Sequence, residues 1–150
     1  MIKIYFFGKK SRISKREREF IRRISKVTEI NLCPLKTPLS SNSLAQKTAE
    51  TKLLRNIKTE DFVIILDQTG QDTTSEKFAK NLENFLIPAP RQNLVFIIGG
   101  ATGLRKEIKS RADQILKFGS MVWTHDLVRL MLLEQIYRAS EIIKDSKFHK

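Results

Sequence analysis

The sequence has few residues that can form disulfides or bind metal ions. Its single cysteine, Cys33, cannot form an intrachain disulfide, so the fold has to rely on an apolar core. The two histidines, His125 and His149, lie far from this cysteine and lack the spacing of zinc ligands, and we expect no metal. No apolar run approaches the ~18 residues of a membrane helix, and the N-terminus lacks the order of a signal peptide. We therefore expect a cytoplasmic protein.

Several motifs of nucleotide-dependent and nucleophilic enzymes are also missing. Gly8-Lys9-Lys10 follows the first apolar run and does not supply G-x-G-x-x-G, which excludes a Rossmann dehydrogenase. Neither the P-loop spacing nor G-x-S-x-G occurs. The remaining chemistry is group transfer without a metal or a covalent intermediate. Methyl transfer from S-adenosylmethionine fits, because the protein then has only to align the reactants and remove a proton from the acceptor.

Acidic residues are scarce relative to basic ones, and the excess is uneven. The chain carries 28 Lys and Arg against 16 Asp and Glu, a net charge of +12. Such a charge attracts polyanions, and RNA is the partner that we expect, with a solvated basic helix as the alternative. Few aromatic side chains accompany the basic ones, which favours phosphate contacts over base stacking. Residues 1–25 hold nine basic side chains: Lys3, Lys9, Lys10, Arg12, Lys15, Arg16, Arg18, Arg22 and Arg23.

Strand-like and helix-like segments alternate along the chain. Apolar runs and alternations predict strands at residues 2–7, 27–33, 61–66, 94–98 and 114–118. Helical periodicity predicts helices after Ser14, over 44–57, after Thr73, over 104–112 and from 125 through 143. Ser14 with Glu17 and Thr73 with Glu76 have the spacing of capping boxes. This order predicts one α/β domain, residues 1–150, with a parallel sheet covered on both faces.

Glycines and prolines mark the connections between these segments. Residues 34–42 are expected to form a loop and residues 67–70 a turn, and Pro88 and Pro90 are expected to close the preceding helix. The apolar run at 94–98 stops at Gly99 and Gly100, which suits either a tight connection or a ligand pocket. Segments 66–70, 99–103 and 118–123 all follow predicted strands. Because parallel strands end at one edge of a sheet, we expect these three segments to converge on one pocket.

The final predicted helix is apolar over most of its circumference. A surface helix usually needs only one apolar stripe. Burial by a second subunit and deep burial within one core both explain such a composition. The apolar side chains are Val128, Leu130, Met131, Leu132, Leu133, Ile136, Tyr137, Ala139 and Ile143.

Two motifs and the C-terminus resemble a known family. Val95-Phe96-Ile97-Ile98-Gly99-Gly100-Ala101-Thr102-Gly103-Leu104 is one motif, and Met121 to Arg129 with Leu133 to Ala139 is the other. Together with the ending Phe148-His149-Lys150, they closely resemble the RlmH family of ribosomal RNA large-subunit methyltransferases, in the SPOUT superfamily. The similarity extends over almost the whole chain and is weaker before Pro34.

The resemblance implies an α/β fold with a C-terminal trefoil knot, a homodimer and S-adenosylmethionine as cofactor. The implied reaction methylates N3 of a pseudouridine in large-subunit ribosomal RNA, within the assembled ribosome. A non-catalytic RNA-binding dimer and a small-ligand sensor are the alternatives, and binding of S-adenosylmethionine and of ribosomes distinguishes them. By motif position, the implied cofactor contacts are Leu66, Gly99, Phe118, Gly119, Ser120, Met121, Val122 and Trp123.

The resemblance also implies residues for the methyl acceptor. His125 and Arg129 share a helix face and are expected to bind the acceptor, and Arg138, four residues after Glu134, matches a functional position. His149 is expected to enter the active site, in its own or the partner subunit, and to position the base or accept its N3 proton. Thr124, Phe148 and Lys150 depart from the proline, tyrosine and arginine usual in the family, which weakens the assignment of the substrate.

Overall fold

The structure, a computed structural model, is built on one five-stranded sheet. It describes residues 1–8, 13–35, 43–86, 92–100 and 103–148. All strand pairs are parallel, in the order β2-β1-β4-β3-β5, which confirms the predicted α/β class. The strands are β1 (Ile2–Phe7), β2 (Ile30–Leu35), β3 (Phe62–Gln71), β4 (Leu94–Ile98) and β5 (Gln114–Leu116).

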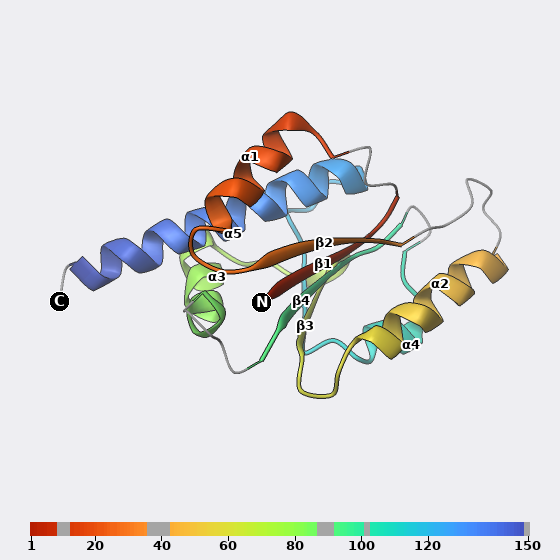
Figure 1. Ribbon diagram of the computed structural model, residues 1–150. Coiled ribbons are helices and arrows are strands. Elements are labelled where there is room, and N and C mark those ends of the chain that lie inside the picture. The colour runs from red at the N-terminus through yellow and green to blue at the C-terminus, as the bar shows by residue number, and fades with distance from the viewer. Residues whose placement is uncertain (9–12, 36–42, 87–91, 101–102, 149–150) are drawn as a thin grey trace.

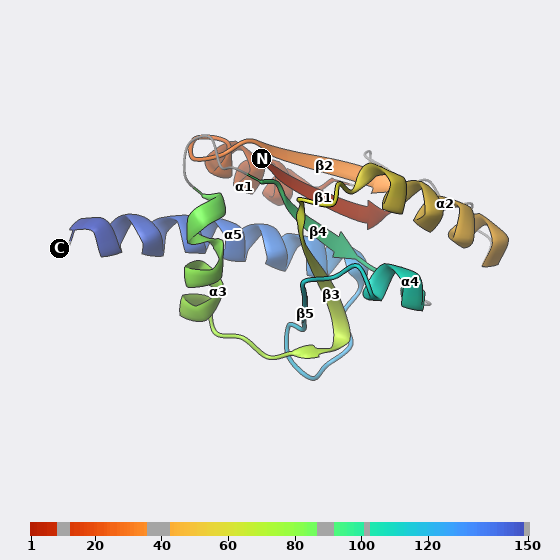
Figure 2. The same cartoon turned by 90° about the horizontal axis from the view of Figure 1, so that it is seen from below.

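Helices cover both faces of this sheet, as the alternation of segments predicts (Figure 1). One face packs against α1 (Lys15–Ile24), α3 (Ser75–Leu82) and α5 (His125–Phe148), with a short 3-10 helix at Glu83–Phe85 after α3. The other face packs against α2 (Ser43–Asn56) and α4 (Lys106–Lys109), seen beside each other in Figure 2. In the part of the chain described, no helix is both long and apolar enough to cross a membrane.

The side chains of the central strands alternate between two apolar clusters. In β4, Leu94, Phe96 and Ile98 join the cluster under α1, α3 and α5, whereas Val95 and Ile97 join the cluster under α2 and α4. All five are at most 2% exposed, so an apolar residue is needed at every position of this strand. This explains why β4 is an uninterrupted apolar run in the sequence.

The predicted capping boxes have different outcomes. At α1 the box is confirmed: Ser14 Oγ accepts from Glu17 N at 3.2 Å, and Glu17 Oε2 accepts from Ser14 N at 2.6 Å. At α3 the prediction is wrong by one residue, because Thr74 and not Thr73 is the N-cap and accepts from Lys77 N at 3.2 Å. Consecutive threonines offer two candidate hydroxyls, and the sequence pattern selected the wrong one.

The end of β3 differs most from the predicted order. Residues 67–70 do not form a simple turn, because β3 continues to Gln71 and both Leu66 and Gln71 pair with Leu116 of β5. The residues between them are therefore displaced outward as a large bulge. Gly70 permits this arrangement, since a Cβ there would lie 2.6 Å from the backbone carbon of Leu116.

Other boundaries shift by a few residues. β2 begins at Ile30 and not at 27, because the amides of Val27 and Thr28 still donate to Ile24 O and complete the end of α1. It also includes Pro34 and Leu35, which were expected in the loop, while residues 36–42, Pro88 and Pro90 lie outside the described residues. α4 and β5 are shorter than the predicted 104–112 and 114–118.

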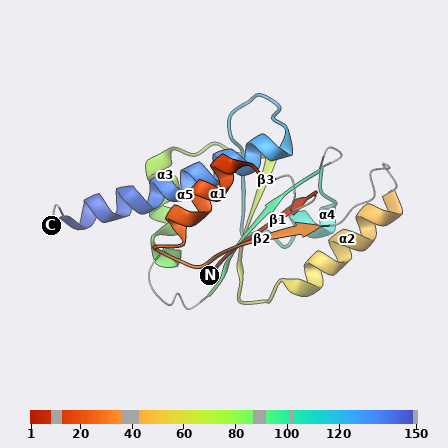
Figure 3. The ribbon, with the colours of Figure 1, turned by 45° about the horizontal axis from the view of Figure 1, so that its top comes forward.

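α5 is the longest helix, and its C-terminal part extends away from the sheet (Figure 3). On one side of α5, its residues Leu132, Leu133 and Ile136 are fully buried, which accounts for that side of its apolar circumference. Leu130 and Met131 are only partly buried and line a cavity between the helices. Burial within the core therefore explains one side of this helix, and burial by a second subunit remains the expectation for the side that carries Leu130 and Met131.

Candidate functional site: a pocket at the carboxyl ends of the strands

The three segments predicted to converge do lie around one cavity of about 360 Å³. The end of β3 supplies residues 66–69, and the loop after β4 supplies Gly99, Gly100 and Gly103. The chain after β5 contributes residues 116–119 and 121–123, and the start of α5 contributes His125 and Val128. The cavity lies beyond the carboxyl ends of the strands, where open parallel sheets bind ligands.

The walls of this pocket are shaped by local backbone geometry. Gly103 and Gly119 have φ values of +74° and +84°, which side chains with a Cβ rarely adopt. Gly103 N donates to Gly100 O at 3.0 Å and closes the glycine loop. The indole Nε1 of Trp123 donates to Phe118 O at 2.9 Å, which ties the two ends of the third segment together.

Seven of the eight residues expected to bind cofactor line the pocket, and Ser120 does not. Sequence reasoning placed segment 66–70 at the pocket without singling out Asp67 or Thr69, and it did not select Lys109; all three line the cavity. Asp67 had a recognisable signal, since it directly follows a buried strand. Lys109 had none, because only the fold brings α4 beside the end of β3.

Asp67 is held as an ionised carboxylate. Its Oδ2 lies 2.8 Å from Lys109 Nζ, and its Oδ1 accepts from both the amide and the hydroxyl of Thr69, at 2.9 and 2.7 Å. Burial acts to raise the pKa of Asp67, but the hydrogen bonds from Lys109 and Thr69 outweigh it and keep this pKa below its usual value. The pocket therefore contains a preorganised pair of opposite charges.

The structure separates the two residues expected to bind the acceptor. His125 lines the pocket, whereas Arg129 is 1% exposed and does not. Arg129 Nε donates to Glu17 Oε1 of α1 at 2.5 Å, and the guanidinium lies 4.2 Å from the ring centroid of Phe6. Its Nη1 lies 3.1 Å from Asp126, and its buried Nη2 has no hydrogen-bond partner among the described residues. Within one chain, Arg129 therefore joins α1 to α5 and does not face the pocket.

Arg138 also lies away from the pocket. It is exposed and pairs with Glu134, four residues earlier on the same helix, at 2.5 Å. It lies thirteen positions after His125, which corresponds to about 20 Å along α5. His149 and Lys150 lie outside the described residues, as does the side chain of Phe148. One chain alone therefore does not bring Arg138 to the pocket.

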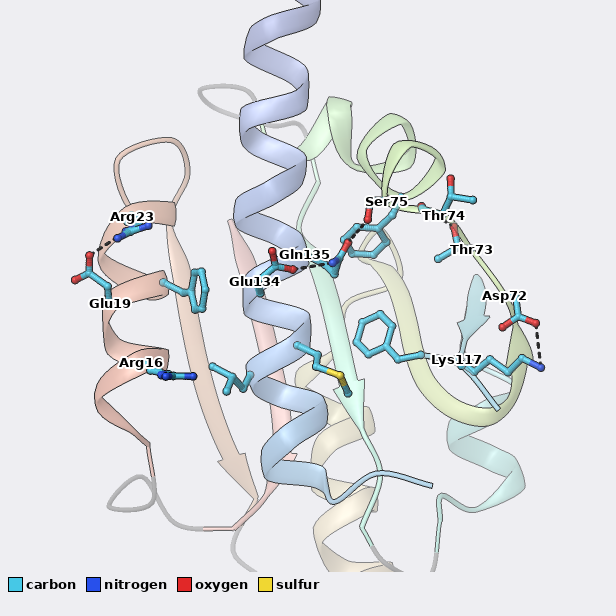
Figure 4. A pocket seen from close by; sticks show the side chains of 16 residues that line it. Arg16, Glu19, Arg23, Asp72, Thr73, Thr74, Ser75, Lys117, Glu134 and Gln135 are labelled. Atoms are coloured by element: carbon cyan, nitrogen blue, oxygen red, sulfur yellow. Dashed lines mark hydrogen bonds and ion pairs between the residues drawn. The ribbon is translucent and has the colours of Figure 1, made fainter. Parts of the chain in front are cut away.

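A second, larger cavity of about 730 Å³ lies between α1, α3 and α5 (Figure 4). We call it the helix groove; its apolar lining consists of Phe20, Phe78, Phe118, Leu130 and Met131. Two ion pairs flank it: on α1, Glu19 pairs with Arg23 at 2.9 Å, and in the segments after β5 and β3, Lys117 pairs with Asp72 at 3.2 Å. Lys117, Phe118 and Gly119 line both cavities, so the groove adjoins the pocket.

Metal ligands are not gathered in either cavity. Over the described ranges, no group of three or more His, Cys, Asp or Glu side chains could hold an ion. The pocket instead offers apolar side chains, glycine backbone and one ion pair, a combination suited to an organic ligand.

Comparison with known proteins agrees with this geometry. A family profile described as "Predicted SPOUT methyltransferase" matches residues 1–149. The chain is 39% identical over 140 residues to the ribosomal RNA large subunit methyltransferase H of Halothermothrix orenii, covering 89% of this chain and 87% of that protein. It is 40% identical over 139 residues to ribosomal RNA large subunit methyltransferase H 1 of Clostridium perfringens, covering 88% and 87%.

A solved structure supports the same fold. The chain superposes on a probable methylase family protein from Haemophilus influenzae with a TM-score of 0.56, at 14% identity, covering 99% of this chain and 70% of that one. The profile match and the two relatives confirm the resemblance found in the sequence. The chain therefore belongs to the SPOUT methyltransferase family.

Proposed function

We propose that this protein is a ribosomal RNA methyltransferase that uses S-adenosylmethionine. The proposed product is a pseudouridine methylated at N3 in large-subunit RNA, formed on the assembled ribosome in the cytoplasm. The observation that carries the proposal is the convergence of three post-strand segments on one pocket in a SPOUT-family chain. The names of the relatives support the choice of ribosomal RNA.

The pocket suits this cofactor in size and lining. Its volume of about 360 Å³ is within the range of small-molecule sites. At Gly99 an added Cβ would lie 3.2 Å from Leu104 Cγ, so glycine lets the Leu104 side chain pack closely against this loop. Leu66, Phe118 and Trp123 supply the apolar walls for an adenine ring. S-adenosylmethionine supplies an activated methyl group when it is bound.

The chain's own residues then have two tasks, alignment and proton removal. His125 lies on the pocket wall at the start of α5, where its imidazole can hydrogen-bond the acceptor base. We assign removal of the N3 proton to His149, whose unperturbed pKa near 6.5 allows it to accept a proton at neutral pH. We assign Arg138 to the RNA side of the site, where its guanidinium can pair with a phosphate.

These assignments require a second subunit. Arg138 is about 20 Å from His125 along one helix, so a site that includes both takes Arg138 and His149 from the partner. Large apolar side chains are exposed beside the pocket: Met121 is 66% exposed, Val122 76% and Leu127 38%. An isologous homodimer would cover these side chains and fill the helix groove. We also propose that the segment after β5 completes the trefoil knot of the family.

Exposed cations on α1 supply a surface for the RNA backbone. Lys15, Arg18 and Arg22 project from the face opposite the buried Glu17 and Ile24, and Lys26 is exposed in the turn just after the helix. Arg22 and Arg23 share Glu19 as an ion-pair partner, which leaves this face strongly positive. Binding through phosphates releases counterions, so ribosome affinity should fall steeply as salt concentration rises.

The decisive experiment is methyl transfer to ribosomes lacking the modification. With isotopically labelled S-adenosylmethionine, we expect label in large-subunit RNA, and mass mapping should locate it on N3 of one pseudouridine. Naked RNA is the matched control and should accept far less label. Absence of cofactor binding at millimolar concentration, together with intact ribosome binding, would contradict the enzyme and favour a non-catalytic RNA-binding dimer.

The shared site has its own test. His125→Ala and Arg138→Ala should each be inactive as pure proteins, because each lacks one half of both sites. If the subunits exchange at random, an equal mixture should recover about one quarter of the unmodified activity, since half of the dimers then hold one intact site. No recovery in mixtures shown to contain mixed dimers would contradict a site built from two chains.

A further inference from the structure

The ion pair between Asp67 and Lys109 lies inside the pocket. The two residues come from the end of β3 and from α4, and both line the cavity. Their side chains are only 12% and 28% exposed, with Nζ and Oδ2 at 2.8 Å. Among the described residues that line this pocket, Asp67 is the only acid.

The pair retains hydrogen-bonding capacity toward the pocket. A carboxylate can accept about four hydrogen bonds, and Asp67 accepts three, two from Thr69 and one from Lys109. An ammonium has three donors, and one of those on Lys109 is directed to Asp67. With respect to the residues that the structure describes, one acceptor position of Asp67 and two donors of Lys109 therefore remain, side by side and partly shielded from water.

The other charges of the pocket are engaged elsewhere or lie farther along it. Lys117 pairs with Asp72 at 3.2 Å, on the side of the helix groove. His125 comes from the start of α5 and also lines the pocket. Among the described side chains that line this cavity, the Asp67–Lys109 pair is therefore the one that complements a ligand with both an ammonium and a carboxylate on one carbon.

We infer that Lys109 binds the α-carboxylate of the cofactor's methionyl end and that Asp67 orients Lys109 and accepts from the α-ammonium. This inference rests on the proposed cofactor and adds residues that recognise its amino-acid part. The geometry also sets the direction of the bound molecule. The amino-acid end lies beside β3 and α4, and the adenosyl part lies toward residues 116–123.

The test compares two ligands that share the adenosine and thioether part. S-adenosylhomocysteine carries the amino-acid group, and 5′-methylthioadenosine lacks it. In calorimetry, Lys109→Met should weaken binding of S-adenosylhomocysteine by about tenfold or more, because a charge-assisted contact is lost, and should leave 5′-methylthioadenosine unchanged. Asp67→Asn should show the same selectivity. If the Asp67→Asn variant does not fold, Lys109→Met still tests the inference.

Lys106→Met is the matched control, since Lys106 lies on α4 and is exposed but does not line the pocket. It should bind both ligands as the unmodified protein does. Equal weakening of both ligands by Lys109→Met, or no weakening of either, would overturn the inference, as would a loss confined to ribosome binding. If the unmodified protein binds neither ligand, the proposed cofactor itself is wrong.

Discussion

The buried ion pair between Glu17 and Arg129 provides the sharpest test of how α1 is held on α5. The two side chains are 3% and 1% exposed, with Nε and Oε1 at 2.5 Å. Replacing Arg129 by Met keeps a long apolar side chain over Phe6 and leaves a buried carboxylate without its counter-charge. Breaking a buried pair in this way costs about 3–5 kcal/mol. For a chain of 150 residues, this lowers Tm by roughly 6–20 °C.

Chemical denaturation followed by circular dichroism, at one fixed protein concentration, measures the loss. The double variant Glu17→Met with Arg129→Met should lose less than the sum of the single variants, since it leaves neither charge buried alone. Arg22→Met is the control: it removes an exposed partner of Glu19 and should cost under about 1 kcal/mol. Additive losses, or an Arg129→Met loss as small as that of the control, would refute the reasoning.

The same pair predicts a pH dependence. Burial acts to raise the pKa of Glu17, but hydrogen bonds from Arg129 and Ser14 outweigh it, so this pKa is lower in the folded state. The stabilisation is therefore fully present above the unfolded value of about 4.5 and is lost as pH falls through the folded pKa. In Arg129→Met, the free energy of unfolding should lose much of this acid-range dependence. A profile parallel to that of the unmodified protein would contradict the assignment.

The remaining predictions concern the close approach of Gly70 to β5, the N-cap of α3 and the hydrogen bond from Trp123 to Phe118 O. Gly70→Ala should destabilise the fold by about 1–3 kcal/mol in urea denaturation, because the new Cβ would lie 2.6 Å from backbone of β5; an unchanged midpoint would contradict this contact. Thr74→Ala should cost about 1 kcal/mol through loss of the α3 cap, whereas Thr73→Ala should cost little. Trp123→Phe removes the bond to Phe118 O and should weaken S-adenosylhomocysteine binding in calorimetry, with far-ultraviolet circular dichroism unchanged.

Much of the fold was predictable because its signals are local. An uninterrupted apolar run such as β4 has few alternatives to a buried strand, and Ser14 with Glu17 marks the start of α1 through contacts three residues apart. The pocket followed from one rule, that parallel strands end at the same edge. Its three segments could therefore be grouped without knowledge of the strand order.

The missed features depend on contacts between distant residues. The bulge in β3 exists because Leu66 and Gln71 both pair with Leu116, a constraint invisible in residues 67–70 themselves. Lys109 enters the pocket only because α4 packs beside β3. The family resemblance placed Arg129 beside His125 in the expected site, and sequence could not show its contact with Glu17, because that carboxylate lies 112 positions earlier.

Lys117, Phe118 and Gly119 form a shared wall between the pocket and the helix groove. A ligand in one cavity that displaced this wall would change the space available in the other, and the two binding equilibria would then be linked. Such linkage is reciprocal: each ligand would change the affinity of the other by the same factor.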